Sequence, residues 1–377
     1  MKAVIAAYGR SPFHFAKKGA LAAVRPDTLA AQVVRGLMQR TGLDPALLED
    51  VILGCAYPEA AQGNNLARIV ALLAALPQSL PGMTVNRFCG SSMSAIHIAA
   101  ANIEAGLGDA FMCIGVESMT MVPQGGFNFS PHPDLFEQTD TYIPMGRTAE
   151  NVARQYRISR QDQEALALLS HQNASAARSE GRLQAEIIAV AGNDGTLIDS
   201  DGCIRPGTTA AALAALAPAF GAHGVVTAGT SSPLTDGAAA VLVTSDEFAA
   251  RHHLPATARI RALASVGCDP ALMGIGPIAA TRRALQRAGL TVDDLDVVEI
   301  NEAFASQALA CIRELGLNPA TINLDGGGMA IGHPLGATGA RITGKAAALL
   351  ARQHGRYALA TQCIGGGQGI ATILEAL

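Results

Sequence analysis

Residues 35–56 read RGLMQRTGLDPALLEDVILGCA, and a similar segment, RRALQRAGLTVDDLDVVEINEA, occupies residues 282–303. The two segments align without a gap at an offset of 247 residues (282 − 35). Each predicts a helix, a Gly-Leu break, a short acidic turn and then a buried strand. Identical residues in the two copies are Arg35, Gln39, Arg40, Gly42, Leu43, Leu48, Val51 and Ala56, which match 282, 286, 287, 289, 290, 295, 298 and 303.

The same register continues beyond these segments at the level of pattern. CGSSMSAIHIAAANI, a predicted helix beginning at Cys89, lies over GATGARITGKAAALL, which begins at Gly336. The predicted strand 109–116 likewise lies over 356–363. Alternating strands and helices predict a parallel sheet covered on both faces. The chain is therefore expected to consist of two similar α/β halves, packed about a pseudo-twofold axis.

The register breaks after Met119, and the first half reaches its last strand, GAAAVLVTS (237–245), only after a long insertion. That insertion contains a helix candidate and a Gly/Asp/Pro-rich stretch at 192–209. We therefore expect three parts: a first half made of residues 1–117 and 236–250, an inserted loop domain at 118–235, and a second half at 256–377.

Composition narrows the possible classes of protein. A net charge of −4 argues against a nucleic-acid partner, and no apolar stretch reaches membrane-spanning length. Apolar residues make up 49% and charged ones 15%, a balance that favours a homo-oligomer with buried subunit surfaces. Seven cysteines without paired spacing favour reduced thiols and a cytoplasmic location. His223, His252 and His253 lack neighbouring ligand spacing, so no metal site is expected.

Two glycine-rich matches to nucleotide-binding motifs are misleading. GARITGKA (339–346) resembles a phosphate-binding loop, but Ala346 replaces the required Ser or Thr and the segment falls within a predicted helix. GIGPIA (274–279) fits a helix entry better than a dinucleotide fingerprint.

Three reactive residues fall at equivalent sheet edges in the repeat: Cys89, His333 and Cys363. A helix start carries unpaired N–H groups and partial positive charge, so we expect it to lower the pKa of Cys89, with Ser91 and Ser92 as caps. Each of the three also fits a purely structural role, as a buried thiol or a turn histidine. The glycines around them permit either ligand approach to backbone N–H groups or tight packing between the halves.

Four segments together resemble the signature segments of the thiolases, the acetyl-CoA acyltransferases, and the similarity extends over nearly the whole chain. The resemblance implies the duplicated thiolase fold, with layers in the order αβαβα, and an inserted loop domain that binds substrate and coenzyme A. The four segments are NRFCGSSMSAIH (86–97), INEAFA (300–305), GGGMAIGHPLGATGAR (326–341) and QCIGGGQGIA (362–371).

The resemblance also implies a role for each matching position. Cys89 resembles the nucleophile that carries the acyl group as a thioester, and His333 resembles the base that activates it. Cys363 resembles the acid/base that moves the proton of the acetyl methyl group. Asn301 would hold a water that forms one oxyanion hole with His333, and the N–H groups of Cys89 and Gly365 would form the other.

For the substrates, the resemblance implies that Arg205 and Ser232 contact coenzyme A. Met145 and Phe304 would line the channel for the pantetheine and acyl groups. Coenzyme A would then act as a co-substrate, with no permanently bound cofactor.

Chain-length preference depends on residues 119–146. The acetoacetyl-CoA-specific thiolases resemble one another in carrying a His-Met pair where this chain has Pro144 and Met145. The stretch also resembles the shorter one of the fatty-acid β-oxidation type, which favours a 3-ketoacyl-CoA thiolase.

Three alternatives stay open at this point: an acetoacetyl-CoA-specific acetyl-CoA C-acetyltransferase, a decarboxylating ketoacyl synthase, and a non-catalytic acyl-CoA or lipid carrier. The family is typically dimeric or tetrameric, and a β-oxidation partner subunit is possible. The direction of the reaction is not fixed by the sequence.

Overall fold

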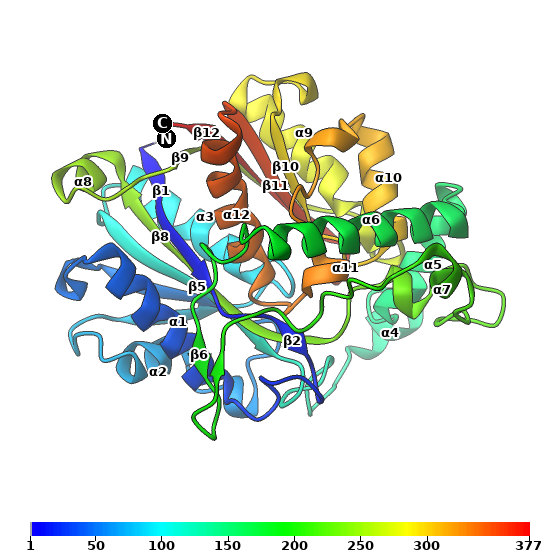
Figure 1. Ribbon diagram of the computed structural model, residues 1–377, viewed down its shortest axis with the longest axis horizontal. Helices are drawn as coiled ribbons and strands as arrows, with labels where there is room; N and C mark the ends of the chain where they lie inside the picture. Colours follow the sequence, from blue (N-terminus) through cyan, green and yellow to red (C-terminus); the bar gives the residue numbers. More distant parts are fainter. Residues whose placement is uncertain (1) are drawn as a thin grey trace.

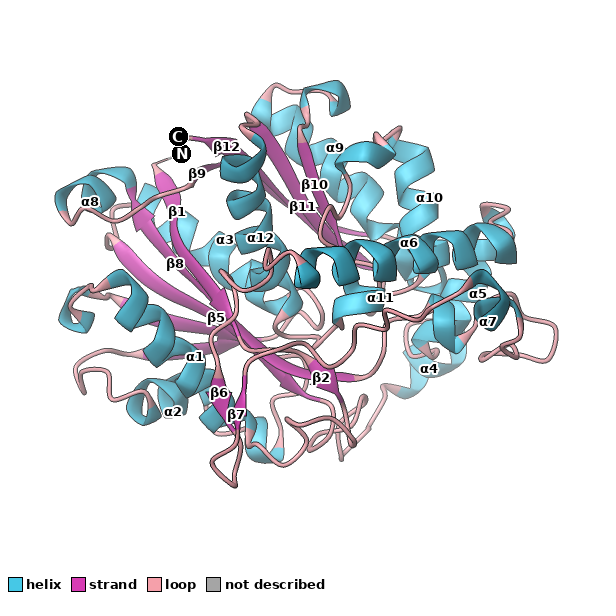
Figure 2. Ribbon diagram, viewed as in Figure 1, coloured by secondary structure: helices cyan, strands magenta, loops and turns pink. Residues whose placement is uncertain are grey.

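The computed structural model describes residues 2–377 and is organised around one large mixed sheet. The strand order is β10-β11-β12-β9-β1-β8-β5-β3-β4, with β2 beside β8, and a separate pair is formed by β6 and β7 (Figure 2). The strands are β1 (Ala3–Arg10), β2 (His14–Phe15), β3 (Asp50–Gly54), β4 (Gly82–Val85), β5 (Ala110–Ser118), β6 (Val190–Ala191), β7 (Leu197–Ile198), β8 (Thr235–Ser245), β9 (Ala258–Gly267), β10 (Val297–Ile300), β11 (Tyr357–Ile364) and β12 (Gln368–Ala376).

The sheet repeats one pattern of strand directions. β3 and β5 are parallel, whereas β5–β8 and β8–β1 are antiparallel. The same sequence of directions recurs in β10–β11, β11–β12 and β12–β9. The expectation of a purely parallel sheet is therefore wrong: β12 follows β11 through the tight turn 365–367, and a hairpin of this kind can only join antiparallel strands. The two halves meet where Val4 and Ile5 of β1 pair with β9.

Helices cover the outer face of each half of the sheet, and two helices lie between the halves. α12 packs on β10, β11 and β12 of its own half and on β1, β5 and β8 of the other, and α3 packs beside it (Figure 1). These two helices form the middle of five layers, with α1 and α2 outside one half and α9 outside the other. The helices are α1 (Pro26–Thr41), α2 (Leu66–Leu73), α3 (Ser91–Glu104), α4 (Pro133–Gln138), α5 (Met145–Gln155), α6 (Arg160–Ser179), α7 (Ala210–Ala214), α8 (Asp246–Arg251), α9 (Gly276–Ala288), α10 (Ala305–Leu315), α11 (Gly328–Ile331) and α12 (Thr338–Gln353).

The repeat that opened the sequence has the predicted local structure in both copies. α1 ends at Gly42 and α9 ends at Gly289, with φ of 65° and 70° in the left-handed region that glycine adopts without strain. Each is followed by a short turn and a buried strand, β3 or β10. The predicted helix, break and strand are therefore confirmed twice.

The long insertion carries α4 to α7 and the β6–β7 pair, and its helices gather along one side of the molecule in Figure 1. Its predicted long helix is α6. The boundaries 118–235 for an inserted domain stay a prediction. Among residues 2–377, no helix is both long and apolar enough to cross a membrane.

Candidate active site

Cys89 lies in the turn between β4 and α3, one residue before the helix N-cap, Gly90. Phe88 precedes it with φ of 43°, a conformation that non-glycine residues rarely adopt. Ser91 holds this turn, since its Oγ accepts a hydrogen bond from the Arg87 N–H at 2.9 Å and donates to the Phe88 carbonyl at 2.6 Å. The expectation that Ser91 caps the helix is therefore wrong, because its hydroxyl is used by the turn.

The surroundings of Cys89 favour the protonated thiol, although the residue is only half-buried. Loss of water around the sulfur is the main cause that raises its pKa to about 12; the N–H groups of Gly365 and of Cys89 itself oppose this rise, and the charge of Glu117 adds to it. The expected lowering by the helix start is thus wrong, because the loss of water around the sulfur outweighs the favourable N–H groups. A thiolate must therefore be generated by proton transfer to a base.

His333 has the hydrogen bonds of a neutral imidazole whose Nε2 carries no proton. It is 3% exposed, and burial followed by the charge of Arg341 lowers its pKa to about 3. The Thr338 hydroxyl donates to the Pro334 carbonyl at 3.0 Å, so its oxygen accepts from His333 Nδ1–H at 2.6 Å. That places the proton on Nδ1 and leaves Nε2 as the acceptor, 3.3 Å from Nδ2 of Asn301. Nε2 of His333 is therefore unprotonated, and the role of His333 as a base stays a prediction.

The loop after His333 lies against the turn that carries Cys89. Leu335 shares an apolar cluster with Cys89 and Met119. Cys363, near the end of β11, is 1% exposed. Burial raises the pKa of its thiol well above the usual range, and a charge on Cys89 raises it further. This group is therefore a weak acid whose thiolate is a strong base.

Glycines allow the two halves to approach at backbone distance. A Cβ at Gly336 would lie 2.5 Å from the carbonyl oxygen of Val116, and one at Gly339 would lie 2.4 Å from the backbone nitrogen of Met93. Such contacts leave no room for a side chain. The two glycines therefore serve close packing between the halves. Ser92, expected to be a cap, instead accepts a hydrogen bond across this contact from a backbone N–H of α12.

The buried carboxylate of Glu117, which the sequence did not single out, also links the two halves. Glu117 is fully buried at the end of β5 and accepts hydrogen bonds from the backbone N–H groups of Ala56 at 2.8 Å and Gly336 at 2.9 Å. The Gln62 side chain donates to it at 2.9 Å. One side chain therefore joins the loop after β3 to the loop after His333.

Comparisons with known proteins agree with this arrangement. The thiolase N-terminal domain family matches residues 3–247, and the thiolase C-terminal domain family matches residues 254–376. The chain belongs to the thiolase family. A 3-ketoacyl-CoA thiolase of Shewanella denitrificans is 49% identical over 99% of both chains, and one of Shewanella baltica is 48% identical over the same share.

A solved structure extends the comparison to three dimensions. The crystal structure of human mitochondrial 3-ketoacyl-CoA thiolase superposes with a TM-score of 0.92 at 36% identity, covering 99% of this chain and 98% of the human one. The thiolase fold with its large central sheet is thus established for this chain.

The four residues expected to contact the substrates of this thiolase fall into two groups. Phe304 and Met145 belong to the apolar cluster that also contains Cys363. Ser232 lies beside them, because its N–H donates to the Ala303 carbonyl at 2.9 Å. Arg205 is exposed and lies farther along the surface, with its guanidinium over the Phe15 ring at 5.0 Å.

A small hollow joins Arg205 to the Ser232 loop. Its lining includes His171, Arg205, Ser231 and Met329. His171 accepts a hydrogen bond at Nδ1 from the Arg205 N–H at 3.3 Å, and burial lowers its pKa to about 4. This neutral histidine was not anticipated from the sequence, where it sits within an ordinary helical pattern.

Proposed function

We propose that this thiolase is an acetyl-CoA C-acyltransferase of the 3-ketoacyl-CoA type, which uses coenzyme A to cleave a 3-ketoacyl-CoA into acetyl-CoA and a shortened acyl-CoA. One observation carries the proposal: the backbone N–H groups of Gly365 and Cys89 lie close enough to the Cys89 sulfur to lower the pKa of its thiol. Two donors at the sulfur are placed for the oxyanion that forms when this atom attacks a carbonyl carbon. The names of the relatives described above support the same substrate class.

In the first half reaction, Nε2 of His333 takes the proton of Cys89, and the sulfur attacks the keto carbon. The N–H groups of Cys89 and Gly365 hold the resulting oxyanion. The bond between the keto carbon and the acetyl unit then breaks, and its electron pair moves onto the acetyl-CoA enolate. The enolate oxygen is held by the protonated His333 and by a water on Asn301, while the Cys363 thiol delivers its proton to the enolate carbon.

In the second half reaction, the Cys363 thiolate takes the proton of free coenzyme A, whose sulfur attacks the acyl group on Cys89. The tetrahedral intermediate uses the same two N–H groups. Its collapse expels Cys89, which recovers its proton from His333. Both cysteines and the histidine return to their starting states, and the kinetics are ping-pong.

The substrate path is part of the proposal. The pantetheine and acyl groups pass between Met145 and Phe304, and Ser232 and Arg205 contact coenzyme A. A hollow of about 670 Å³ lies beside the start of α5 and is lined by residues 136–140 and 142–144 with Asp269 and Pro270. It can admit an acyl tail longer than that of acetoacetyl-CoA, which favours broad chain-length use.

The proposal extends to location and assembly. All seven cysteines are free, which fits a reducing cytoplasm. We propose a homodimer or homotetramer with no permanently bound cofactor. A β-oxidation partner subunit is compatible with this proposal.

The test is a series of thiolysis rates over 3-ketoacyl-CoA substrates, from acetoacetyl-CoA to long chains, with free coenzyme A. Substantial rates on medium and long chains support the proposal. Activity confined to acetoacetyl-CoA would make the chain an acetyl-CoA C-acetyltransferase. Binding of acyl-CoA without any thiolysis would make it a carrier.

A further inference from the structure

Within the described residues 2–377, the side chains of Arg341 and Glu299 form a buried ion pair that no hydrogen bond supports. Arg341 is 0% exposed and Glu299 is 0% exposed, with Nη1 and Oε2 3.4 Å apart. Among residues 2–377, no hydrogen-bond partner reaches Nε, Nη1 or Nη2 of Arg341, or either carboxylate oxygen of Glu299. An ion pair taken out of water without supporting hydrogen bonds is a poor source of stability.

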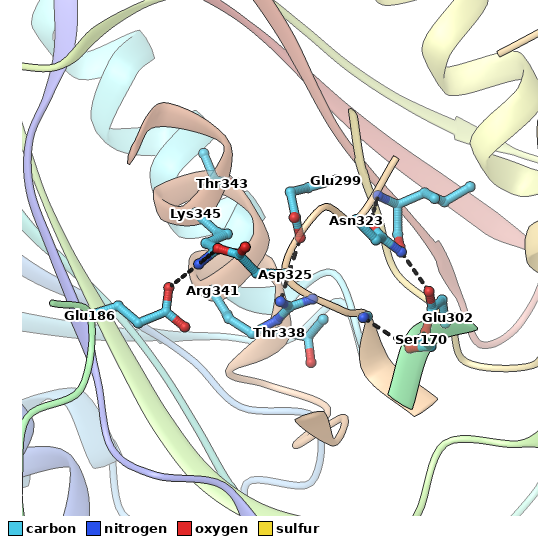
Figure 3. Close-up of polar contacts among 12 residues, drawn as sticks. Ser170, Glu186, Glu299, Glu302, Asn323, Asp325, Thr338, Arg341, Thr343 and Lys345 are labelled. Carbon is cyan, nitrogen blue, oxygen red and sulfur yellow. Dashed lines mark hydrogen bonds and ion pairs between the residues drawn. The ribbon is translucent and has the colours of Figure 1, made fainter. Parts of the chain in front are cut away.

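Other buried cations of this protein are well satisfied. Lys345, one turn further along α12, lies 3.0 Å from Glu186 and 2.6 Å from Asp325 (Figure 3). Arg10 donates through two nitrogens to both oxygens of Asp201 at 2.7 and 2.8 Å. Arg341 therefore differs from Lys345 and Arg10, whose charges are paired with carboxylates at hydrogen-bond distance.

Each member of the ion pair is close in sequence to a residue that is hydrogen-bonded to His333. Thr338, which accepts from His333 Nδ1, is three residues before Arg341 and thus on the same face of α12. Asn301, which lies at His333 Nε2, is two residues after Glu299 and thus on the same side of the extended chain. Figure 3 shows Glu299 and Arg341 facing each other, with Thr338 beside the guanidinium.

We propose that Arg341 and Glu299 are positioning residues that set how readily His333 accepts the proton of Cys89. The guanidinium disfavours a second positive charge on the imidazole, and the ionised carboxylate offsets this effect. The inference rests on the proposed function, because it takes His333 to be the base for Cys89.

The direction of each effect follows from the charges. Arg341 lowers the pKa of His333, after the larger effect of burial. Burial raises the pKa of Glu299 to about 7, against the lowering effects of Arg341 and Lys345. As the pH falls through about 7, Glu299 becomes neutral, and the charge of Arg341 acts on His333 without compensation. The other titratable groups that face Glu299 are Tyr8, Glu186 and Asp325.

The test measures alkylation of Cys89 by iodoacetamide, read by mass spectrometry across a pH series. The sulfur attacks iodoacetamide as its proton moves to Nε2 of His333, so at a given pH the part of the rate that needs His333 rises with the proton affinity of that residue. A change of one pKa unit in His333 alters this part of the rate by at most about tenfold.

Opposite changes are expected in two variants. Glu299→Gln should slow alkylation by about threefold to tenfold above neutral pH and remove the inflection of the wild-type profile near pH 7. Arg341→Met should accelerate alkylation by a similar factor, whereas Arg341→Lys, which keeps the charge, should restore the wild-type rate. If Arg341→Met does not fold, Glu299→Gln and Arg341→Lys still decide the matter.

Two controls isolate the effect. Thr343→Val removes a buried hydroxyl from the same helix, which donates to the Gly339 carbonyl at 2.7 Å, and should leave Cys89 alkylation unchanged. In a His333→Ala background, Glu299→Gln should have no effect on the rate. Rates that fall alike in Glu299→Gln and Arg341→Met, or an effect that survives without His333, would overturn the inference.

Because alkylation needs no acyl substrate, this outcome is separate from that of the proposed function. If the variants change Cys89 alkylation as expected but the protein has no thiolysis activity, only the proposed function is refuted. Thiolysis with an unaltered alkylation rate in Glu299→Gln refutes only the inference.

Discussion

Replacing Thr338 by valine removes one hydroxyl and almost no volume, yet we expect it to prevent His333 from acting as a base. The Thr338 oxygen is the acceptor that keeps the His333 proton on Nδ1. Without it, that N–H is buried and unpaired. The imidazole can then move its proton to Nε2, where Oδ1 of Asn301, which has no hydrogen-bond partner among residues 2–377, becomes an acceptor after rotation of the amide. That tautomer cannot take the proton of Cys89.

The size of the effect follows from the hydrogen bond that is lost. An unpaired buried donor costs about 1–3 kcal/mol, which is the expected free-energy preference for the wrong tautomer in Thr338→Val. A difference of about 1.4 kcal/mol is tenfold in rate, so kcat/KM should fall by roughly tenfold to a hundredfold. KM should change little, because Thr338 belongs to the hydrogen bonds of His333 and is not among the residues expected to contact substrate.

Thr343→Val is the matched control. Thr343 lies on the same helix, is 0% exposed, and its hydroxyl donates to the Gly339 carbonyl at 2.7 Å without contacting His333. Thiolysis kinetics and urea unfolding should be measured for both variants. We expect similar losses of unfolding free energy and a rate defect in Thr338→Val alone. Equal rates in the two variants would show that the Thr338 hydroxyl does not fix the tautomer.

Four further outcomes are expected. Cys363→Ala should still form [¹⁴C]acyl-enzyme from a simple acyl-CoA but lose full thiolysis by roughly 10²–10⁴, whereas Cys89→Ala should lose both; equal losses in Cys363→Ala would contradict the division of roles. Gly336→Ala should unfold at markedly lower urea, because its Cβ would lie 2.5 Å from the Val116 carbonyl oxygen, while Gly207→Ala, with nothing within 4 Å, should not. Burial opposes ionisation of Asp325, but Arg352 and Lys345 lower its pKa to about 2. The stability that this carboxylate contributes is therefore present above its unfolded pKa of about 3.9 and is lost as the pH falls toward about 2. Asp325→Asn should flatten this part of the urea-stability profile. Light scattering should give a mass above 38.6 kDa, and a monomer at micromolar concentration would contradict the proposed oligomer.

The repeat predicted most of the fold because it encodes local structure twice. Gly42 and Gly289 end equivalent helices for the same conformational reason, and the strands after them are buried in both copies. Strand direction was not predictable in this way. Whether β8 and β12 run antiparallel to their neighbours depends on where the chain re-enters the sheet, which no local pattern records.

The chemistry of the site was predicted less completely than its residues. The positions of Cys89, His333 and Cys363 follow from motifs, but their pKa values depend on water lost on folding, which a helix-start argument cannot weigh. Arg341 illustrates the same limit. In TGARITGKAAALL it would be taken for a residue on a solvated helix face, yet α12 is the middle layer of the fold and Arg341 is fully buried.

A protonated resting thiol fits two-step acyl transfer better than a permanent thiolate. In the proposed mechanism Cys89 attacks one carbonyl and later leaves from the acyl group, so a strongly stabilised thiolate would make a good leaving group and a poor nucleophile. With its pKa raised to about 12, the sulfur is basic and reacts only when His333 can take its proton. The N–H groups of Gly365 and Cys89 then act on charge as it moves from sulfur to the substrate oxygen. Under the proposed mechanism, the partial burial of this thiol keeps it protonated until His333 takes the proton, and the close packing at Gly336 helps to hold the surrounding loops in place.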